Sequence, residues 1–237
     1  MNQPSDSPGH RPIRSFVLRQ GRMTAAQTKA LDTLWPRYGL NLPMDTPLDL
    51  EEVFGRSAPR TLEIGFGNGE ALSLLAGQHP ERDFLGVEVH GPGVGQLLHR
   101  VGAKGLDNVR VFRGDALQVL ETALAPACLD EVLLWFPDPW PKTRHHKRRI
   151  VDTRLLDLVH SRLRAGGHFH LATDWQEYAE WMLEKLSARP DFRNDVAQGG
   201  FLPPPAPRPQ TKFERRGLGL GHQVWDLRFH TLDAADL

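Results

Sequence analysis

The sequence predicts an α/β protein with a mostly parallel, doubly wound sheet, and three observations support this. Short apolar runs alternate with amphipathic runs from about residue 60 onward, which is the order of a chain that passes repeatedly from strand to helix. The apolar runs are nearly continuous, as expected for parallel strands that are covered on both faces. The 237 residues, 40% of them hydrophobic, suffice for one sizeable core and favour a single domain.

The elements follow from these patterns in chain order. Strands are expected at residues 61–66, 83–89, 108–112, 131–136, 167–173 and 223–229. Helices are expected at residues 71–78, 93–102, 116–124, 151–164 and 176–186. In the helix at 151–164, apolar side chains recur at helical spacing, so that face belongs to the core. Five prolines between residues 203 and 209 predict a stiff connector or lid, because proline cannot continue a sheet ladder.

Composition and charge are uneven along the chain. The first 30 residues are poor in apolar side chains and rich in Pro, Ser and Arg, which predicts a flexible basic tail at 1–30 and one domain at 31–237. The net charge is zero, from 29 basic and 29 acidic residues. Positive charge nevertheless gathers at 11–29 and again at 142–149, where either a solvated surface or an anionic partner would explain it.

Several classes of protein are not expected. No apolar run is long enough for a membrane helix and the N-terminus has no apolar signal core, so we expect no membrane contact and a cytoplasmic location. The single cysteine, Cys128, excludes a disulfide framework and is expected to be a small packing residue.

The first chemically informative motif is LEIGFGNG, in which Gly65, Gly67 and Gly69 follow a strand and open a helix. Glycines at such a turn let a ligand approach the backbone. The spacing is not that of a pyrophosphate-binding loop, and Glu63 before the glycines would repel a pyrophosphate. An acid in this place suits a ligand with a cationic centre and an amino group.

Two more acids follow at the ends of the next two strands. Glu88 lies 19 residues beyond Gly69, where a carboxylate can accept hydrogen bonds from both hydroxyls of a ribose. Asp115 follows the third strand and would lie near an adenine amino group. Each acid alone would pass for a surface or capping residue. Together with Glu63, they lie where open α/β sheets bind ligands, and the set resembles the S-adenosylmethionine site of class I methyltransferases.

The stretch FPDPWPKTRHHKRR, residues 136–149, follows the fourth strand. Pro137 and Pro139 restrict the backbone on either side of Asp138 and orient its carboxylate. Enzymes that methylate amino nitrogens of bases use a comparable turn, in which a polar side chain holds the base and an aromatic ring stacks on it. The cations that follow fit phosphates. The two histidines are more consistent with phosphate or water contacts than with a metal site, and we expect no metal.

This stretch resembles the signature of the bacterial tRNA (guanine-N7-)-methyltransferase family, TrmB. The resemblance extends through RSFVLRQGRMT, LEIGFGNG, GVEVHGPGVG, ATDW and TKFERRGLGLGHQVWDL, and it covers nearly the whole chain from about residue 13. It implies a Rossmann-like class I methyltransferase fold whose C-terminal strand is antiparallel. It also implies transfer of a methyl group from S-adenosylmethionine to N7 of guanosine 46 in the tRNA variable loop. A monomer is expected, with a dimer as the alternative.

The resemblance also implies roles for individual residues. The active-site acid would be Asp138. The cofactor would be bound by Glu63, Gly65, Gly67, Gly69, Glu88, Asp115 and Asp138. The guanosine would be bound by Lys142, Asp174, Thr211, Lys212, Phe213 and Glu214, although Asp174 would serve equally well as a helix cap. The RNA would be contacted by Arg144, His145, His146, Lys147, Arg148, Arg149 and, in the tail, Arg19.

The chemistry of guanine N7 restricts the role of Asp138. N7 carries a lone pair and no proton, so the reaction needs no general base, and catalysis should rest on positioning and electrostatics. Two other functions remain open from the residues. One is methylation of an exocyclic amine in another nucleic acid. The other is an RNA-binding module without turnover, although the intact glycines and acids speak against it.

Overall fold

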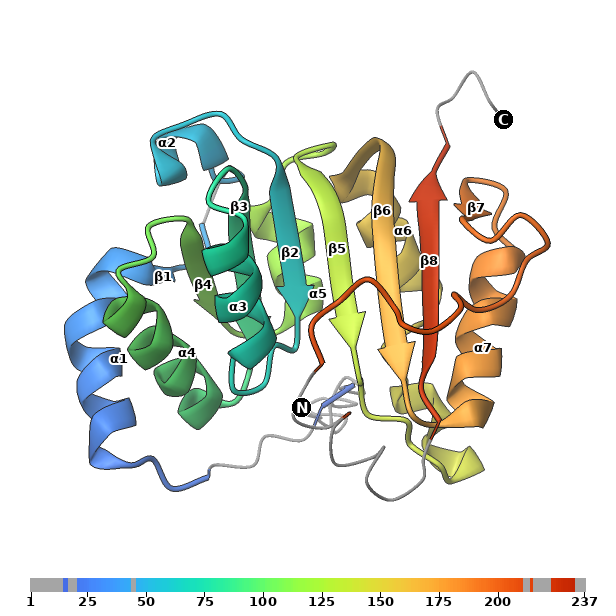
Figure 1. Ribbon diagram of the computed structural model, residues 1–237, viewed down its shortest axis with the longest axis horizontal. Helices are drawn as coiled ribbons and strands as arrows, with labels where there is room; N and C mark the ends of the chain where they lie inside the picture. The colour runs from blue at the N-terminus through green and yellow to red at the C-terminus, as the bar shows by residue number, and fades with distance from the viewer. Residues whose placement is uncertain (1–14, 17–20, 44–45, 211–213, 215–222, 233–237) are drawn as a thin grey trace, which may run out of the picture.

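A computed structural model describes residues 15–16, 21–43, 46–210, 214 and 223–232 of the chain (Figure 1). The expected alternation of strands and helices is present. The strands are β1 Gly39–Leu40, β2 Arg60–Ile64, β3 Asp83–Glu88, β4 Val109–Arg113, β5 Leu129–Trp135, β6 Leu163–Thr173, β7 Phe192–Asn194 and β8 Trp225–Thr231. The helices are α1 Ala25–Tyr38, α2 Leu50–Phe54, α3 Glu70–Gln78, α4 Gly91–Lys104, α5 Ala116–Gln118, α6 Thr153–Arg162 and α7 Gln176–Ser187. A π-helical segment η1 (Val119–Ala123) extends α5, and a 3-10 helix η2 (Thr143–Arg148) precedes α6.

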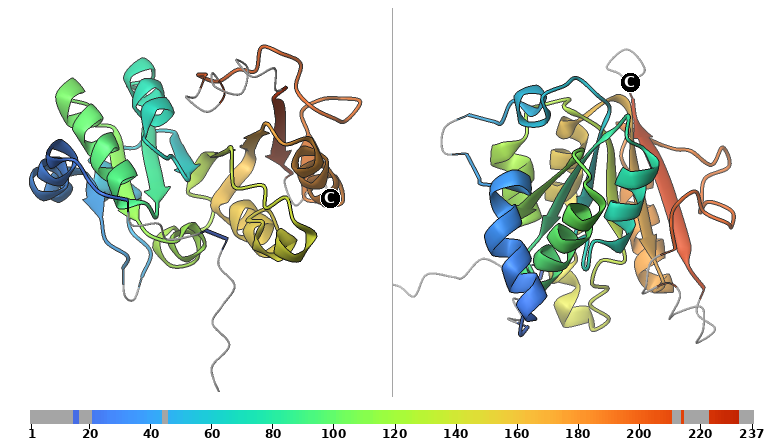
Figure 2. Two further views of the ribbon diagram at one scale, coloured as in Figure 1. Left: turned by 90° about the horizontal axis from the view of Figure 1, so that it is seen from below. Right: turned by 60° about the vertical axis from the view of Figure 1, so that its left-hand side comes forward.

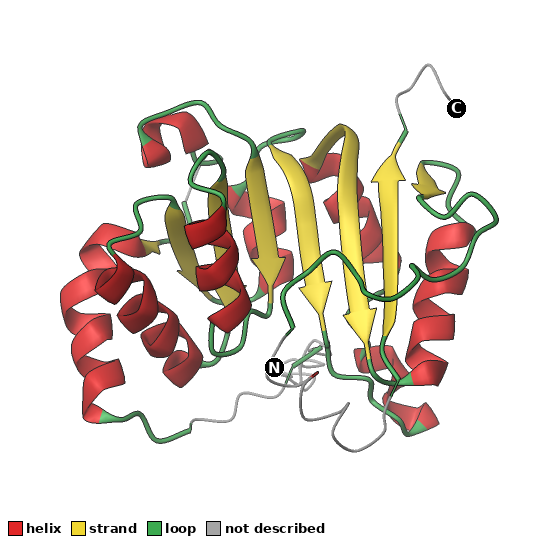
Figure 3. Cartoon of the chain, in the orientation of Figure 1, coloured by secondary structure: helices red, strands yellow, loops and turns green. Residues whose placement is uncertain are grey.

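The described strands form one sheet in the order β1-β4-β3-β2-β5-β6-β8-β7. The strands from β1 to β6 in this order pair in parallel, whereas β8 runs antiparallel to both β6 and β7. The chain moves from β2 outward to β3 and β4 and then returns to β5 on the other side. The carboxyl ends of the parallel strands therefore meet at one edge, and the order reverses between β2 and β5 (Figure 3). Ligands bind at such a reversal in open α/β sheets.

Helices cover both faces of the sheet (Figure 2). On one face, α1, α3 and α4 enclose an apolar cluster that includes Tyr38, Leu72 and Leu97. On the other face, α2, α5, α6 and α7 pack on a larger cluster that contains Leu62, Leu155 and other residues of the central strands. Burial of these side chains accounts for the near-continuous apolar runs, since each central strand is covered on both sides. No helix in the described ranges has the length and apolar character needed to cross a membrane.

The structure corrects the expected boundary between tail and domain at residue 30. Helix α1 already begins at Ala25, because Thr24 and Gln27 form a capping box. The Thr24 hydroxyl accepts from the Gln27 amide, and the Gln27 side chain accepts from the Thr24 amide. The expected flexibility of the tail concerns mainly residues that lie outside the described ranges. The Pro-rich segment at 201–210 contains no strand, as expected.

Candidate active site

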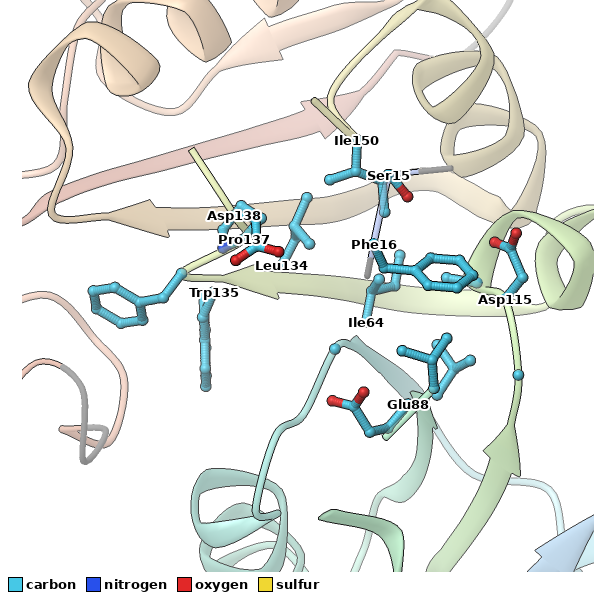
Figure 4. A pocket seen from close by; sticks show the side chains of 16 residues that line it. Ser15, Phe16, Ile64, Glu88, Asp115, Leu134, Trp135, Pro137, Asp138 and Ile150 are labelled. Carbon is cyan, nitrogen blue, oxygen red and sulfur yellow. The ribbon is translucent and has the colours of Figure 1, made fainter. Parts of the chain in front are cut away.

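Several of the expected site residues line one pocket. It lies at the edge of the sheet where the strand order reverses. The pocket encloses about 600 Å³, including its opening to solvent. Figure 4 shows the carboxylates of Glu88, Asp115 and Asp138 on different sides of this space. The complete lining is Ser15, Phe16, Ile64, Gly65, Val87, Glu88, Val89, Gly114, Asp115, Ala116, Leu134, Trp135, Phe136, Pro137, Asp138 and Ile150. Three acids, at or just beyond the carboxyl ends of three different strands, thus line one cavity.

The glycine-rich loop between β2 and α3 requires glycine for conformational reasons. Gly65, Gly67 and Gly69 have φ angles of 71°, 57° and 68°, in the left-handed region that other residues rarely adopt. A side-chain carbon on Gly65 would meet nothing within 4 Å, so this backbone is open toward the pocket. The Glu88 carboxylate fastens the loop to the end of β3 by accepting from the Gly67 amide, and it also accepts from the His90 amide before α4, both at 2.9 Å. Glu88 therefore lines the cavity and also orders its floor.

Asp115 caps a helix and also lines the pocket. Its side chain accepts from the Leu117 amide at 3.0 Å and caps α5. It also lines the pocket. Capping fixes the carboxylate at the rim, because an N-cap side chain has a defined orientation relative to its helix.

Glu63 lies beneath the pocket and not on its lining. Its side chain is 5% exposed, and within the described part of the chain its Oε2 atom has no hydrogen-bond partner. Burial, and secondarily the neighbouring charge of Glu88, raises the pKa of Glu63 to about 8. A carboxyl group in this state favours a cationic neighbour, because a nearby positive charge would stabilise its ionised form.

Replacement of Glu63 by glutamine should change how stability depends on pH. The raised pKa means that the folded chain holds a proton that the unfolded chain releases, so the parent protein loses stability as the pH rises from about 4.5 to about 8. Glu63→Gln removes this loss. Its free energy of unfolding should rise relative to the parent by at most about 1.4 kcal/mol per pH unit in that window. Urea unfolding of both proteins at several pH values measures the difference, and a difference that stays constant would contradict the assignment.

The turn that carries Asp138 is held in an unusual conformation. Phe136 and Trp140, one before Pro137 and one after Pro139, have φ angles of 55° and 47°, which are costly for residues with large side chains. The Phe136 amide donates to the Ala172 carbonyl of β6 at 2.7 Å. The two prolines restrict the backbone as the sequence indicated, and contacts outside the turn are needed to hold its ends. This conformation directs Asp138 to the pocket (Figure 4).

Sequence reasoning missed one part of the pocket. Ser15 and Phe16, from the segment that was expected to be a tail, line it. The Ser15 carbonyl accepts from the Trp140 indole at 3.3 Å, and the Phe16 ring extends toward Asp115 (Figure 4). The sequence signals here are the apolar residues Phe16 to Leu18 inside a basic segment and the family motif RSFVLRQGRMT, and neither indicates a place in the pocket.

The basic run forms η2 and does not present all of its side chains to solvent. Arg144 and Lys147 are exposed. Arg148 lies over the Trp140 ring at 5.1 Å, and His145 packs against the edge of the same ring. Desolvation and the surrounding cations lower the pKa of His145. Arg149 was expected to contact the RNA, and the structure corrects this. Its side chain is fully buried and paired with Glu177, so it is not placed to meet a phosphate.

The residues that were expected to bind guanosine lie in three places where the structure describes them. Lys142 is exposed at the start of η2. Asp174 lines a second, more open pocket together with Trp175, Gln176, Glu177, Gln223 and Trp225. The N-cap position of α7 is Trp175, the residue that follows Asp174. Thr211, Lys212, Phe213 and Arg19 lie outside the described residues.

Glu214 is held by a buried polar cluster beneath the Pro-rich segment. Arg208 binds Glu214 through two hydrogen bonds of 2.5 and 3.1 Å, and binds Asp226 of β8 through two of 2.5 and 2.9 Å. His170 of β6 joins the same Asp226 at 3.0 Å. The Arg208 guanidinium also stacks over Phe136 at 5.3 Å. The Pro-rich segment crosses this face of the sheet (Figure 1), and Arg208 fixes it beside the turn that carries Asp138.

Two remaining expectations concern cysteine and metal. Cys128 packs against the larger apolar cluster, and burial raises its pKa to about 11, which agrees with a packing role. Within the ranges that the structure describes, no three His, Cys, Asp or Glu side chains lie together in a way that could hold a metal ion.

The fold is shared with known methyltransferases of low sequence identity. The structure of the 16S rRNA methyltransferase KamB matches with a TM-score of 0.58 at 14% identity, over 83% of this chain and 98% of that chain. The antibiotic-resistance methyltransferase Kmr matches with a TM-score of 0.55 at 15% identity, over 84% and 98%. At these identities, the similarity is one of fold.

Sequence comparison is more specific. A family model described as "Putative methyltransferase" matches residues 57–227. A tRNA (guanine-N(7)-)-methyltransferase of Pseudomonas syringae pv. syringae is 57% identical over 224 residues, which cover 94% of this chain and 91% of that protein. The enzyme of the same name from Ectopseudomonas mendocina is 56% identical and is covered over 94% of both chains. With the motifs and the pocket described above, these matches show that the chain belongs to the bacterial tRNA (guanine-N7-)-methyltransferase family of class I methyltransferases.

Proposed function

We propose that this protein transfers the methyl group of S-adenosylmethionine to N7 of guanosine 46 in the variable loop of tRNA. The observation that carries the proposal is the convergence of Glu88, Asp115 and Asp138 on one pocket in a chain that is 57% identical to a tRNA (guanine-N(7)-)-methyltransferase. A cytoplasmic location, where tRNA is found, and a monomeric state belong to the same proposal.

The residues around the pocket fit S-adenosylmethionine. Glu63 offers a buried carboxylate oxygen that has no hydrogen-bond partner among the described residues, and its pKa is about 8, which suits the ammonium and sulfonium charges of this cofactor. Glu88 retains lone pairs for the ribose hydroxyls, since each carboxylate oxygen accepts more than one hydrogen bond. Asp115 would accept from the adenine amino group. Gly65 lines the pocket and would let the ligand approach the backbone, and Gly67 and Gly69 would hold the loop in the conformation that allows this.

The protein's contribution to the reaction is positioning and electrostatics. The cofactor supplies an electrophilic methyl group, and guanine N7 attacks it with its own lone pair, so no side chain has to remove a proton. Asp138, on the pocket wall, and Asp174 would accept from guanine N1–H and from the amino group. Both carboxylates favour the positive charge that develops on the base. Lys142 and the segment Thr211 to Glu214 would complete the guanosine site.

The RNA would be docked by the exposed part of the basic run. Arg144, Lys147 and Arg148 would neutralise phosphates, with His145 and His146 as further contacts and Arg19 as a further cation in the tail. Arg149 is left out of this set because it is buried.

Replacement of Glu88 by alanine should weaken cofactor binding. The ribose hydroxyls would lose a charged acceptor worth roughly 1.5–3 kcal/mol per bond, less the replacement by water. The glycine-rich loop and the start of α4 would each lose one hydrogen bond. Titration calorimetry measures the effect. Glu81→Ala is a suitable control, because Glu81 is an exposed acid that pairs with His79 at the protein surface. Parental affinity in a folded Glu88→Ala variant would remove Glu88 from the cofactor site.

The position of methylation can be tested with paired substrates. We expect the protein to methylate a tRNA transcript with guanosine at position 46 and to leave a transcript with adenosine at that position unmethylated. Equal incorporation into both transcripts would show that another nucleotide is the target.

A further inference from the structure

Arg149 is the last residue of the basic run, and its environment differs from that of the exposed cations before it. Its side chain is completely buried, whereas Arg144 and Lys147 in the same run are exposed. A buried guanidinium is costly unless it is paired and its donors are used. Its contacts therefore indicate what the residue is for.

The guanidinium is almost saturated with partners. Nε donates to the Pro139 carbonyl at 3.0 Å, and the two terminal nitrogens donate to the Glu177 carboxylate at 3.0 and 2.5 Å. A fourth contact, of 3.1 Å, joins it to His146 Nε2. The planar group also stacks over the rings of Tyr178 and Trp181 at 4.9 and 5.1 Å. The hydrogen bond from Arg149 is the main cause that lowers the pKa of Glu177.

These partners belong to the two segments that carry Asp138 and Asp174, the acids proposed to bind guanine. Pro139 follows Asp138 directly, and its carbonyl lies inside the strained turn. Glu177 is in the first turn of α7, three residues after Asp174. The prolines restrict φ within the turn but leave the plane of the Pro139 carbonyl free to rotate, and the Arg149 hydrogen bond fixes that plane.

We propose that Arg149 is a positioning residue that sets Asp138 and the start of α7, with Asp174, at a fixed separation, and that it contacts no tRNA phosphate. The inference rests on the proposed function. It explains why an arginine stands here, since lysine offers neither a two-pronged pair with a carboxylate nor a planar group that stacks on rings.

The test compares the rate of methyl transfer with the salt dependence of tRNA binding. Arg149→Lys should slow single-turnover transfer at saturating tRNA by roughly 10- to 100-fold, because small displacements of reacting groups cost about this much. The slope of log affinity against log salt and the affinity for S-adenosylmethionine should stay parental. Lys147→Gln is the comparison for a phosphate contact, because its log–log salt slope should be flatter than that of the parent by about 0.9. Arg154→Gln, from an exposed pair with Glu121, is the control that should alter neither quantity.

A second variant keeps the proposal testable if Arg149→Lys does not fold. Glu177 is half exposed, so Glu177→Gln should fold and should slow transfer several-fold without changing the salt slope. Where both single variants fold, the double variant should be no slower than Arg149→Lys alone, because both changes break the same link.

Three results would overturn the proposal: a parental rate in Glu177→Gln, an additive double variant, or a flattened salt slope in Arg149→Lys. The parent protein is assayed beside them. If the parent itself methylates no tRNA, the proposed function fails and not the role of Arg149.

Discussion

Replacing Asp138 by alanine is expected to slow methyl transfer by roughly 10²- to 10³-fold, while the affinities for S-adenosylmethionine and tRNA stay close to parental. The large effect on rate follows from its place on the wall of the pocket, where it would hold the guanine edge and stabilise the charge that appears on the base. The small effect on tRNA affinity follows because docking energy comes from many phosphates, whereas Asp138 contacts one base.

Single-turnover assays at saturating tRNA and cofactor measure this effect. Asp107→Ala is the control, since Asp107 is an exposed acid on the protein surface that pairs with Arg37. The rate of the parent should be independent of pH across the range in which a general base would titrate, because N7 has no proton to remove. A near-parental rate in Asp138→Ala would refute its orienting role, and a sigmoidal pH profile in the parent would indicate a base.

Replacing Arg144, Lys147 and Arg148 together by glutamine should flatten the salt dependence of tRNA binding by roughly 2 to 3 in log–log slope, about 0.9 for each neutralised phosphate. The same variant should keep the parental affinity for S-adenosylmethionine, because none of the three side chains lines the pocket. Titrations at several salt concentrations measure the slope, with Arg154→Gln as the control for an exposed cation elsewhere.

The outcome decides between the two interpretations of the basic run. If the triple variant retains the parental slope, the run is a solvated edge and the RNA is held elsewhere, with the Arg-rich segment at 11–29 as the next candidate. If the slope flattens and the single-turnover rate at saturating tRNA is kept, the run docks tRNA and the turn at Asp138 carries out the chemistry.

The central strand and helix pairs could be predicted because their signals are local. The apolar runs and the helical spacing of Leu155 and Val159 lie within single elements, and the structure contains those elements within a few residues of the expected bounds. The elements that were missed have weak local signals. Strand β1 has two residues and exists through its pairing with β4, and α1 lies in a stretch whose charged and polar residues obscure its apolar face.

The acids of the pocket could be predicted for a topological reason. Residues that follow parallel strands must come to one edge, so Glu88, Asp115 and Asp138 could be grouped without coordinates. The contacts that support them could not be predicted, because each joins residues far apart in the chain. Arg149 reads as one cation in a run until Glu177 is seen beside it. Arg208 reads as part of a proline-rich connector until it is seen between Glu214 and Asp226.

The central claim is that the methyl group arrives at N7 of a tRNA guanosine. The most direct measurement is to incubate the purified protein with tRNA and S-adenosylmethionine labelled in the methyl group, digest the tRNA to nucleosides and identify the labelled species by mass spectrometry. We expect the label in 7-methylguanosine, and we expect nuclease mapping to place it at position 46 of the variable loop. Label in a nucleoside methylated on an exocyclic amine, or binding of tRNA with no incorporation of label, would contradict it.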